Sequence, residues 1–494
     1  MNQSDIDALR SQVLSPRSHF IGGRWIAASE GGHRDVLSPV DGTVLTQIAE
    51  GTPADMEAAI ATARAAFEDG RWSRQSPAER KKVLLKLADL IEKHALELAV
   101  LGVRDNGTEI TMAMKAEPMS AAGTFRYYAE AIDKVYGQIA PTAESVLGLI
   151  HHAPVGVVGA IVPWNMPLMI GSWKLAPALA TGNSVVLKPA ESASLSLLKL
   201  AELAAEAGVP DGVLNVVTGS GRVVGETLAL SMDVDIMVFT GSGATGRRLL
   251  EYSARSNMKR CYLELGGKSP NIVFNDAPDL SEAAKVSAGG IFRNAGQICI
   301  AGSRLLVQED IHDEFVAELV KHAEAMRVGN PLDLDTQIGA VHSLPELDSN
   351  LEFVARAEAE GAERRTGGGR ILEETGGYYM APTVMTKVKP TDNLFQNEVF
   401  GPVLAVTPFK DEDEAIQLAN STVYGLSSGV WTSNLSRAHR MIAGIRAGVV
   451  HVNTYGGSDL TVPLGGMGQS GNGHDKSLHA FEKYLDLKTA WIKL

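Results

Sequence analysis

Val157-Val-Gly-Ala-Ile-Val162 and, after a short gap, Asn183-Ser-Val-Val-Leu187 are the runs on which the fold of this chain depends. Both are apolar and rich in β-branched residues, without polar alternation. Strands of this kind are buried on both faces, as in parallel sheets covered by helices. Three similar runs follow, Leu214 to Val217, Asp235 to Phe239 and Arg260 to Leu265. Helical segments separate the runs, at about 168–180, 194–207, 222–231 and 244–254. This alternation predicts a doubly wound parallel sheet, which binds ligands beyond the carboxyl ends of its strands.

The residues before this region predict turns and then helices. Residues 1–50 read as short strands and turns, with Gly22-Gly23 and Asp41-Gly42 as turn signals. Periodicity predicts a helix from Asp55 to Glu68, and Ser76-Pro-Ala-Glu79 is a capping box that opens another, ending at about Leu101. A third helix is expected at about 120–134.

The second half of the chain repeats the strand and helix alternation and predicts a second α/β domain. Strands are expected near 271–274, 304–308, 382–388, 402–408, 428–432 and 449–453, and helices near 280–291, 312–326, 412–419 and 435–446. The acidic, Gly-rich region 329–378 reads as irregular. The segment from Ser477 to Leu494 begins as a helix and ends as an alternating strand, Leu487 to Ile492, with no obvious partner nearby.

Composition excludes several classes of protein. The 494 residues carry a formal charge of −13 and show no basic stripe, which argues against a nucleic-acid partner. Two cysteines cannot make a disulfide framework and suit a reducing compartment. The most apolar stretch, Val155 to Ile170, is too short and too interrupted by prolines to span a membrane. The start of the chain lacks the features of a signal peptide. We expect a cytoplasmic protein without membrane contact and without a metal site.

Cys299 is the first candidate for chemistry. It lies in Phe292-Arg-Asn-Ala-Gly-Gln-Ile-Cys-Ile-Ala-Gly-Ser-Arg304, a Gly-rich connection between a predicted helix and a predicted strand. The backbone amides of such a loop can point at a developing anion, and glycines let a ligand come close. A lone cysteine is more often a buried structural residue, so the choice between the two interpretations rests on other motifs.

Two glycine-rich turns indicate a dinucleotide. Gly241-Ser-Gly-Ala-Thr-Gly246 follows a strand and opens a helix, which is the context of a phosphate-binding turn, and Ser220-Gly-Arg-Val-Val-Gly225 is a second such turn. The acidic residue expected about 20 positions after the first turn would fall near Glu264, for which another role is preferred below. Lys188-Pro-Ala-Glu191 ends a strand and could hold a ribose, although a solvated ion pair is an equal alternative.

Three further motifs place polar groups at strand ends. Pro163-Trp-Asn-Met-Pro167 holds a side-chain amide between two prolines, where it could donate to an oxyanion; the alternative is an ordinary turn. Glu264-Leu-Gly-Gly-Lys268 and Glu398-Val-Phe-Gly-Pro402 each place a carboxylate just before glycine. Each motif is ambiguous alone.

Together these motifs resemble those of the aldehyde dehydrogenase superfamily, from Phe20-Ile-Gly-Gly to Lys488-Thr. The matching motifs also include Trp173-Lys, Gly182-Asn-Ser-Val-Val-Leu-Lys-Pro-Ala-Glu191, Phe239-Thr-Gly-Ser242, Gly296-Gln-Ile-Cys299 and Pro463-Leu-Gly-Gly466. The resemblance implies a Rossmann-like cofactor domain, a second α/β catalytic domain and a small β oligomerisation arm. It implies residues 1–134 and 155–265 for the first, 266–476 for the second, and 135–154 with 477–494 for the arm.

The resemblance also implies a mechanism. Cys299 is the nucleophile that forms a thiohemiacetal, with Asn165 and the Cys299 amide as the oxyanion hole. Glu264 is the base that activates water to hydrolyse the thioester. Lys174, in the Trp173-Lys pair, is a further catalytic residue. The structural alternative, a non-catalytic member of the family, would not require Cys299, Glu264 and Asn165 together.

The implied cofactor is NAD. Lys188 and Glu191 are expected at the adenosine ribose, Ser242 at the pyrophosphate, and Glu398 with Phe400 at the nicotinamide. The full set of expected cofactor residues is Pro163, Trp164, Lys188, Glu191, Gly221, Gly225, Phe239, Gly241, Ser242, Leu265, Glu398 and Phe400. Because the Glu191 carboxylate would repel a 2′-phosphate, NAD should be preferred over NADP.

The substrate is the least determined feature. Tyr128-Ala-Glu-Ala-Ile-Asp-Lys-Val-Tyr-Gly137, Ser256-Asn-Met-Lys-Arg260 and Gln469-Ser-Gly-Asn-Gly-His-Asp-Lys-Ser-Leu-His-Ala480 resemble gamma-glutamyl-gamma-aminobutyraldehyde dehydrogenases. Gamma-glutamylaminobutyraldehyde or a related omega-amino aldehyde is therefore expected, and a semialdehyde or aromatic aldehyde is the alternative. The resemblance also implies a homodimer or homotetramer.

A tunnel to Cys299 is expected to bind this substrate. By alignment of the motifs, Arg293, Glu117 and Asp459 fall near the mouth of the tunnel, where opposite charges could hold a zwitterionic end. Each of the three could equally be a solvated surface charge. The aliphatic stem would lie along Met166, Trp173, Ile298, Ile300 and Leu464.

Overall fold

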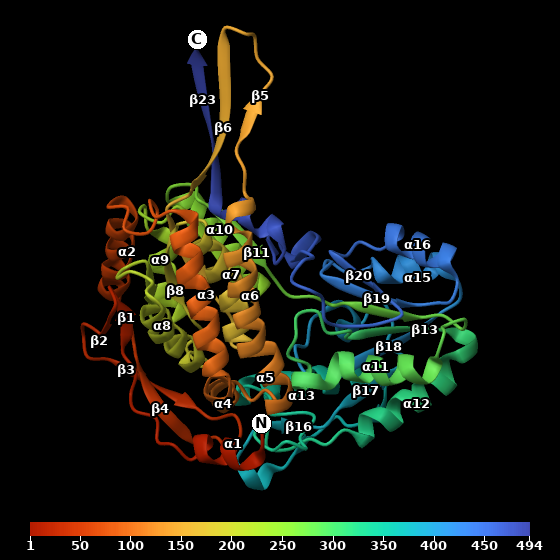
Figure 1. Ribbon diagram of the computed structural model, residues 1–494. Coiled ribbons are helices and arrows are strands. Elements are labelled where there is room, and N and C mark those ends of the chain that lie inside the picture. The colour runs from red at the N-terminus through yellow and green to blue at the C-terminus, as the bar shows by residue number, and fades with distance from the viewer.

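Two seven-stranded sheets form the body of the molecule in the computed structural model, which describes residues 1–494 (Figure 1). The first sheet has the order β11-β10-β7-β8-β9-β1-β2, and its five strands from β7 to β11 run parallel. Its strands are β1 (His19–Ile21), β2 (Arg24–Ile26), β7 (Val157–Ile161), β8 (Ser184–Lys188), β9 (Leu214–Val216), β10 (Ile236–Thr240) and β11 (Arg260–Glu264). The predicted parallel sheet is confirmed, and β1 and β2 extend it as an antiparallel edge.

Helices cover both faces of this sheet, so its strands are apolar on both sides. Val185 and Leu187 of β8 face a core shared with α3, α6, α7 and α8, whereas Val186 between them faces a core shared with α2, α9 and α10. These helices are α2 (Pro53–Glu68), α3 (Pro77–Lys93), α6 (Ser120–Ala131), α7 (Pro167–Ala180), α8 (Leu195–Ala207), α9 (Glu226–Leu230) and α10 (Gly243–Arg255). Burial on both faces explains why the strands lack polar alternation.

The second sheet has the order β14-β17-β18-β13-β12-β19-β20 and is parallel except for β14. Its strands are β12 (Pro270–Val273), β13 (Arg304–Gln308), β14 (Glu363–Thr366), β17 (Thr383–Thr386), β18 (Val403–Phe409), β19 (Ser427–Trp431) and β20 (Val449–Val452). Its helices are α11 (Leu280–Phe292), α12 (His312–Ala325), α13 (Leu344–Ala359), α14 (Asn393–Gln396), α15 (Glu412–Ala419) and α16 (Leu435–Gly444). The second α/β unit predicted from the sequence is therefore present.

A third, antiparallel sheet projects away from both α/β units as an arm (Figure 1). It has the order β23-β6-β5, with β5 (Gln138–Ala140), β6 (Val146–Pro154) and β23 (Leu485–Lys493). No partner for the terminal strand is apparent nearby in the sequence, and its partner in the fold is distant: β23 pairs with β6 along its whole length, from Leu485 opposite Pro154 to Lys493 opposite Val146. The partner was missed because it lies more than 300 residues earlier in the chain.

Four other expectations need correction. A helix, α1 (Gln3–Arg10), lies in the region expected to hold only strands and turns, and Asn2 caps its N-terminus. The helix that opens at the Ser76 capping box ends at Lys93, and α4 (Ala95–Asn106) follows after His94. The helix expected at 222–231 begins with a π-helical turn at Gly221–Gly225. The region taken as irregular contains α13 and β14, and Ser343 caps α13 by accepting a hydrogen bond from Glu346 N. Ordinary capping chemistry was present at Asn2 and Ser343 and was overlooked.

The remaining elements are short and connect the larger ones. They are α5 (Ile110–Met114), the hairpin β3 (His33–Leu37) with β4 (Val44–Ala49), the pair β15 (Arg370–Ile371) with β16 (Tyr379–Met380), and the pair β21 (Leu464–Gly465) with β22 (His474–Asp475). None of the helices combines the length and the apolar character needed to cross a membrane.

Candidate active site

Cys299 lies in the connection between α11 and β13, where the backbone takes an uncommon path. Asn294, Ala295 and Gly296 have φ values of 52°, 50° and 73°, in the left-handed region. At Gly296 a Cβ atom would come within 2.0 Å of the Gly401 carbonyl oxygen, so only glycine fits. The Glu109 carboxylate accepts a hydrogen bond from the Asn294 backbone amide, and the Thr108 hydroxyl donates to the Asn294 side-chain oxygen over 2.7 Å. The loop that leads to Cys299 is therefore fixed in one conformation.

The electrostatic surroundings of Cys299 keep its thiol protonated at rest. Burial raises the pKa of Cys299 to about 12, and the nearby carboxylates of Glu398 and Glu264 act in the same direction. The nearby backbone amides of Ile300 and of Cys299 itself oppose this rise in pKa. A thiol in these surroundings needs a base to accept its proton when it attacks.

Asn165 lies against the loop that carries Cys299. Its side chain is buried, and its Nδ2 donates to the Gln297 carbonyl oxygen over 2.8 Å. A side-chain amide has two N–H groups, so one N–H remains available to a ligand. Asn165 follows β7 and comes just before α7, so the first unit supplies it to a loop of the second.

Glu264 ends β11 beside a buried group of charges. Lys174 and Lys483 both donate to the Asp475 carboxylate, over 2.5 Å and 2.6 Å, and all three side chains are almost fully buried. Burial raises the pKa of Glu264 well above its ordinary value, and the charge of Asp475 adds to the rise, whereas Lys174 and Lys483 oppose it. Glu264 Oε1 is buried without a hydrogen-bond partner in the protein, so it can accept from a bound molecule.

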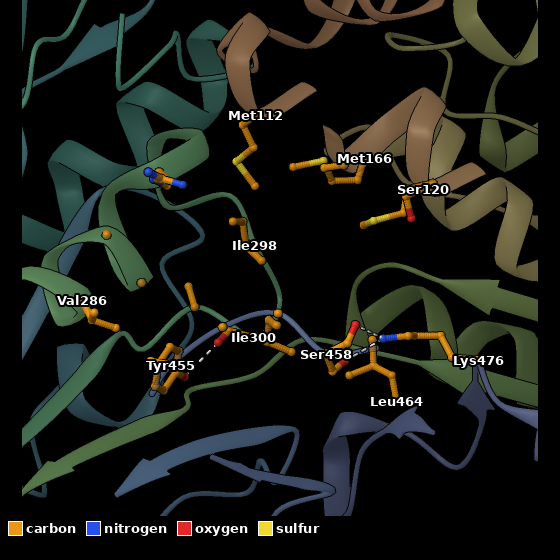
Figure 2. A pocket seen from close by; sticks show the side chains of 18 of the residues that line it. Met112, Ser120, Met166, Val286, Ile298, Ile300, Tyr455, Ser458, Leu464 and Lys476 are labelled. Carbon is orange, nitrogen blue, oxygen red and sulfur yellow. Dashed lines mark hydrogen bonds between the residues drawn. The ribbon is translucent and has the colours of Figure 1, made fainter. Parts of the chain in front are cut away.

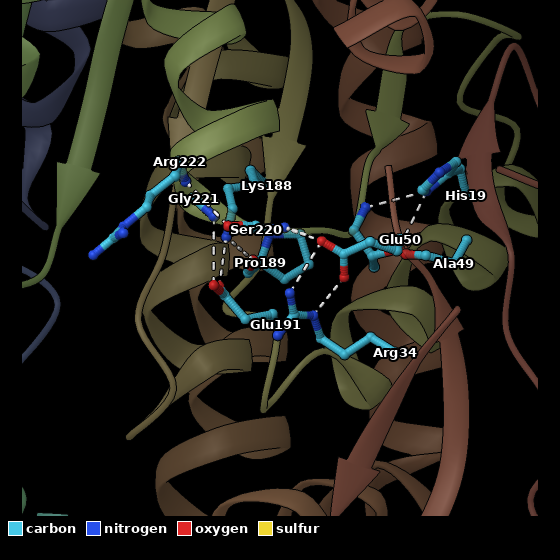
Figure 3. Close-up of polar contacts among 11 residues, drawn as sticks. His19, Arg34, Ala49, Glu50, Lys188, Pro189, Glu191, Ser220, Gly221 and Arg222 are labelled. Carbon is cyan, nitrogen blue, oxygen red and sulfur yellow. Dashed lines mark hydrogen bonds and ion pairs between the residues drawn. The ribbon is translucent and has the colours of Figure 1, made fainter. Parts of the chain in front are cut away.

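A second group of polar residues lies at the carboxyl ends of β8 and β9 (Figure 3). Lys188 donates to Glu191 Oε2 over 2.9 Å, and the Gly221 amide approaches Glu191 Oε1 at 3.4 Å. Burial would raise the pKa of Glu191, but Lys188 holds it below its ordinary value, so the carboxylate stays ionised. A Cβ at Gly225 would come within 3.7 Å of the Lys188 stem, which lies along this turn. A carboxylate, an ammonium group and a bare backbone turn fit a ribose and its phosphate.

The turn after β10 belongs to the same edge of the sheet. Ser242 caps α10, with its hydroxyl accepting from Thr245 N over 3.3 Å. A Cβ at Gly241 would come within 2.5 Å of the Phe239 ring, so glycine allows this ring to lie against the turn. Leu265 packs against Gly246 in the same way. The structure thus brings the predicted cofactor residues of β8, β10 and the two glycine turns to one edge.

The remaining predicted cofactor residues lie between the two units. The Gly267 amide donates to Glu398 Oε1 over 2.8 Å, and burial raises the pKa of Glu398 to about 7. Phe400 has a φ of 58° and meets the Trp164 ring edge to face at 5.4 Å. Trp164, which follows Pro163 after β7, stacks on His342 with ring centroids 4.2 Å apart. No motif in the sequence pointed to His342.

A cavity of about 610 Å³ reaches the loop of the thiol (Figure 2). Ile298 and Ile300, the neighbours of Cys299 in the chain, line it. Six of the eight predicted substrate residues line this cavity, namely Met166, Trp173, Arg293, Ile298, Ile300 and Leu464. Both α/β units contribute walls, for example Met112 and Met169 from the first and Val286 and Tyr455 from the second. A largely apolar cavity of this size suits an extended organic substrate.

The two predicted acidic residues of the mouth do not line the cavity. Glu117 is 2 % exposed, its Oε2 accepts from the Met169 amide over 2.6 Å, and burial raises its pKa to about 8. The expectation of a charge at the mouth is therefore wrong for Glu117, which packs behind the wall. Asp459 is exposed and accepts from the Thr461 amide, although its neighbours Ser458 and Leu460 do line the cavity. Sequence reasoning did not single out Lys476, Asp475 and Lys483. Their charges, in a segment that otherwise contains both polar and apolar residues, were a usable signal.

Comparison with known proteins agrees with this geometry. The model of the aldehyde dehydrogenase family matches residues 25–490. The chain is 50 % identical over 475 residues to the NADP/NAD-dependent aldehyde dehydrogenase PuuC of Escherichia coli, covering 96 % of this chain and 95 % of that one. The crystal structure of gamma-glutamyl-gamma-aminobutyraldehyde dehydrogenase from Burkholderia cenocepacia superposes with a TM-score of 0.98 at 47 % identity, over the full length of both chains.

A structure with a different named substrate is equally similar. The indole-3-acetaldehyde dehydrogenase AldA of P. syringae, solved with NAD+ and IAA, also gives a TM-score of 0.98, at 48 % identity over the full length of both chains. With the thiol loop, the buried carboxylate and the edge suited to a dinucleotide, these similarities show that the chain belongs to the aldehyde dehydrogenase family and is one of its NAD(P)-dependent enzymes.

Proposed function

We propose that this enzyme oxidises an extended aldehyde of the gamma-glutamylaminobutyraldehyde type to its carboxylate, with NAD as the acceptor. The observation that carries the proposal is the cavity, which is apolar along most of its walls, reaches the residues on either side of Cys299, and has charged side chains in its lining. An aliphatic stem with a charged far end suits such walls. The similarity to the gamma-glutamyl-gamma-aminobutyraldehyde dehydrogenase of Burkholderia cenocepacia supports this choice.

In the first half of the reaction, Cys299 attacks the aldehyde carbon. As the sulfur–carbon bond forms, the thiol, which burial keeps protonated at rest, releases its proton to solvent. The Cys299 amide and the free N–H of Asn165 then stabilise the oxyanion of the thiohemiacetal. When bound, NAD supplies the acceptor for the hydride that leaves this carbon. The product of this half is a thioester on Cys299.

In the second half, Glu264 removes a proton from the water that cleaves the thioester. Its pKa is raised by burial and by Asp475, so that the carboxylate binds a proton readily. Lys174 and Lys483 keep Asp475 ionised, and burial holds this group rigid. We assign to Lys174 a positioning role through Asp475.

The cofactor would be held mainly by residues of the first unit, with two residues of the second unit at the nicotinamide side. Lys188 and Glu191 would bind the adenosine ribose, Gly221, Gly225 and Ser242 would leave room for the phosphates, and Glu398 with Phe400 would face the nicotinamide side. Phe239, Gly241, Leu265, Pro163 and Trp164 would complete the walls. The preorganised Lys188–Glu191 pair supports the ribose assignment.

Two alternatives remain within this proposal. The AldA similarity favours an aromatic aldehyde, and cationic residues such as Arg293 suit a short acidic semialdehyde. The deciding measurement compares kcat/KM for gamma-glutamylaminobutyraldehyde, succinic semialdehyde and indole-3-acetaldehyde by NADH formation. We expect the first to be the best substrate. A clear preference for indole-3-acetaldehyde would contradict the proposal, and a complete lack of NADH formation with all three would favour a non-catalytic family member.

We also propose that the protein is a homodimer or homotetramer. The arm exposes large apolar side chains, with Ile139, Leu487 and Trp491 each about two-thirds or more exposed. An exposed strand edge with apolar side chains favours pairing with another chain.

A further inference from the structure

Lys476 is a buried cation in the wall of the substrate cavity to which no role has yet been given. It is 4 % exposed and lines the cavity together with Trp173, Leu464 and Ser458. Its Nζ donates to the Ser458 carbonyl oxygen over 2.9 Å and to the Ser458 hydroxyl over 2.6 Å (Figure 2). An ammonium group has three donors, so one N–H of Lys476 has no partner in the protein. Nζ also lies 5.8 Å from the centroid of the Trp173 ring, a cation–π contact.

The backbone holds Lys476 in this place. Its φ is 66° and that of Ser477 is 51°, so two consecutive non-glycine residues lie in the left-handed region. The conformation is fixed by the Ser477 amide, which donates to the Leu460 carbonyl oxygen, and by the Tyr128 hydroxyl, which donates to the Ser477 carbonyl oxygen. The preceding residue, Asp475, points to Lys174 and Lys483. The turn therefore directs the Asp475 side chain into the buried group of charges and the Lys476 side chain into the cavity. Strain of this kind concentrates at functional sites.

The charges of the cavity wall all have one sign. Its charged lining residues are Lys285, Arg293 and Lys476, and no carboxylate lines it. Lys285 is well exposed and paired with Glu282, and Arg293 is exposed, so Lys476 is the buried cation among them. A buried ammonium group with an unused donor, next to apolar walls, attracts an anion and repels a cation. The sequence predicted opposite charges that hold a zwitterionic end of the substrate. No acidic side chain lines the cavity, so the negative charge of that prediction is absent from its wall.

We propose that Lys476 recognises a carboxylate at the far end of the aldehyde substrate and thereby makes the enzyme selective for anionic aldehydes. The inference rests on the proposed function and refines it, because the glutamyl group carries such a carboxylate. The unused N–H of Lys476 donates to the carboxylate, Ser458 and Trp173 hold the ammonium group, and the apolar walls receive the stem. An omega-amino aldehyde without a carboxylate is correspondingly a poor substrate.

The test compares an omega-carboxylate aldehyde with its methyl ester, which has nearly the same length but no charge. Wild type should show the higher kcat/KM with the carboxylate. Lys476→Met should raise KM for the carboxylate about tenfold or more, as expected for a lost charge-assisted hydrogen bond. In the same variant, KM for the ester, KM for NAD and kcat should each change by less than about twofold. Lys476→Arg should restore part of the preference.

Lys285→Met is the matched control, because it removes an exposed cation from the same cavity. It should leave the carboxylate preference close to that of wild type. An equal loss of kcat/KM for the carboxylate and for the ester in Lys476→Met would show that Lys476 has only a structural role, and would overturn the proposal. If that variant does not fold, wild type alone decides, since an ester oxidised as efficiently as the carboxylate also overturns it. Failure of wild type to oxidise either aldehyde would instead contradict the proposed function.

Discussion

At the scale of single residues, Cys299 is the group without which no oxidation should occur. Cys299→Ala should abolish NADH formation while leaving the fold and NAD binding intact, because the covalent step has no substitute nucleophile. The other cysteine, Cys261, is buried on β11 in the core, and burial raises its pKa. The measurement is steady-state activity, with circular dichroism and NAD titration as controls. Dehydrogenase activity above a trace would contradict the assignment.

Glu264→Gln should separate the two halves of the reaction. The amide keeps the size of the side chain but cannot take a proton from water, so thioester hydrolysis should fall by about 10²-fold or more. A rapid burst of NADH followed by slow turnover is expected in stopped-flow absorbance. Absence of the burst would show that Glu264 is already needed to deprotonate Cys299, whose thiol is protonated at rest.

The selectivity for a carboxylate should depend on pH. Burial lowers the pKa of Lys476 to about 8, against the opposing charges of Asp459 and Asp475. Because only the protonated amine attracts an anion, the preference should be full well below pH 8, about half lost near that value, and lost at higher pH. The measurement is the ratio of kcat/KM for the carboxylate and its ester, in which the pH dependence of the common chemistry cancels. A ratio constant from pH 6 to 10 would contradict this reading of Lys476.

At the scale of elements, β23 completes the arm. Deleting residues 486–494 removes the strand that pairs with β6, whose other neighbour, β5, covers only a few residues. The long exposed edge of β6 should make the truncated protein aggregate, and it should disrupt assembly between subunits. Light scattering should show a dimer or tetramer for the full chain and smaller, aggregation-prone species after truncation. An unchanged monomer in both cases would contradict an assembly role for the arm.

At the scale of the whole molecule, cofactor binding should stabilise the fold, and the size of the stabilisation should show whether NAD or NADP is preferred. A ligand at 100 times its Kd raises the free energy of unfolding by about 2.7 kcal/mol. NAD should therefore raise Tm more than an equal concentration of NADP, because the ionised Glu191 repels a 2′-phosphate. Glu191→Gln should reduce the difference, since Lys188 then faces the phosphate without an opposing charge. Equal shifts with both cofactors in wild type would contradict this preference.

The arrangement of the whole molecule also explains why the active site lies where it does. The thiol loop and Glu398 come from the second unit, whereas Asn165, Lys174 and Glu264 come from the first. The cavity is lined by both units, so neither alone contains a complete site. The N-terminal hairpin contributes as well, because Glu50 accepts from the Ser220 amide near the Lys188–Glu191 pair and is itself paired with Arg34 (Figure 3).

The sequence by itself determined the parallel sheets, the second α/β unit and the motifs of the site. These features depend on local patterns, since burial on both faces leaves continuous apolar runs and tight turns require glycine. The capping box at Ser76 was predicted for the same reason. Matching motifs also indicated the family, which the comparisons confirm.

Only the tertiary structure decided which distant segments pair and which charged side chains face the cavity. The pairing of β23 with β6 joins segments more than 300 residues apart, and no local signal specifies such a register. Glu117 and Lys476 are both charged residues in segments near the cavity, yet the fold buries Glu117 against a backbone amide and directs Lys476 into the cavity. Which side chain faces a ligand depends on backbone dihedrals and on neighbours from distant segments, such as the Leu460 carbonyl that fixes the turn after Lys476. For that reason the sequence indicated the reaction, whereas the three-dimensional packing determined the charge of the cavity.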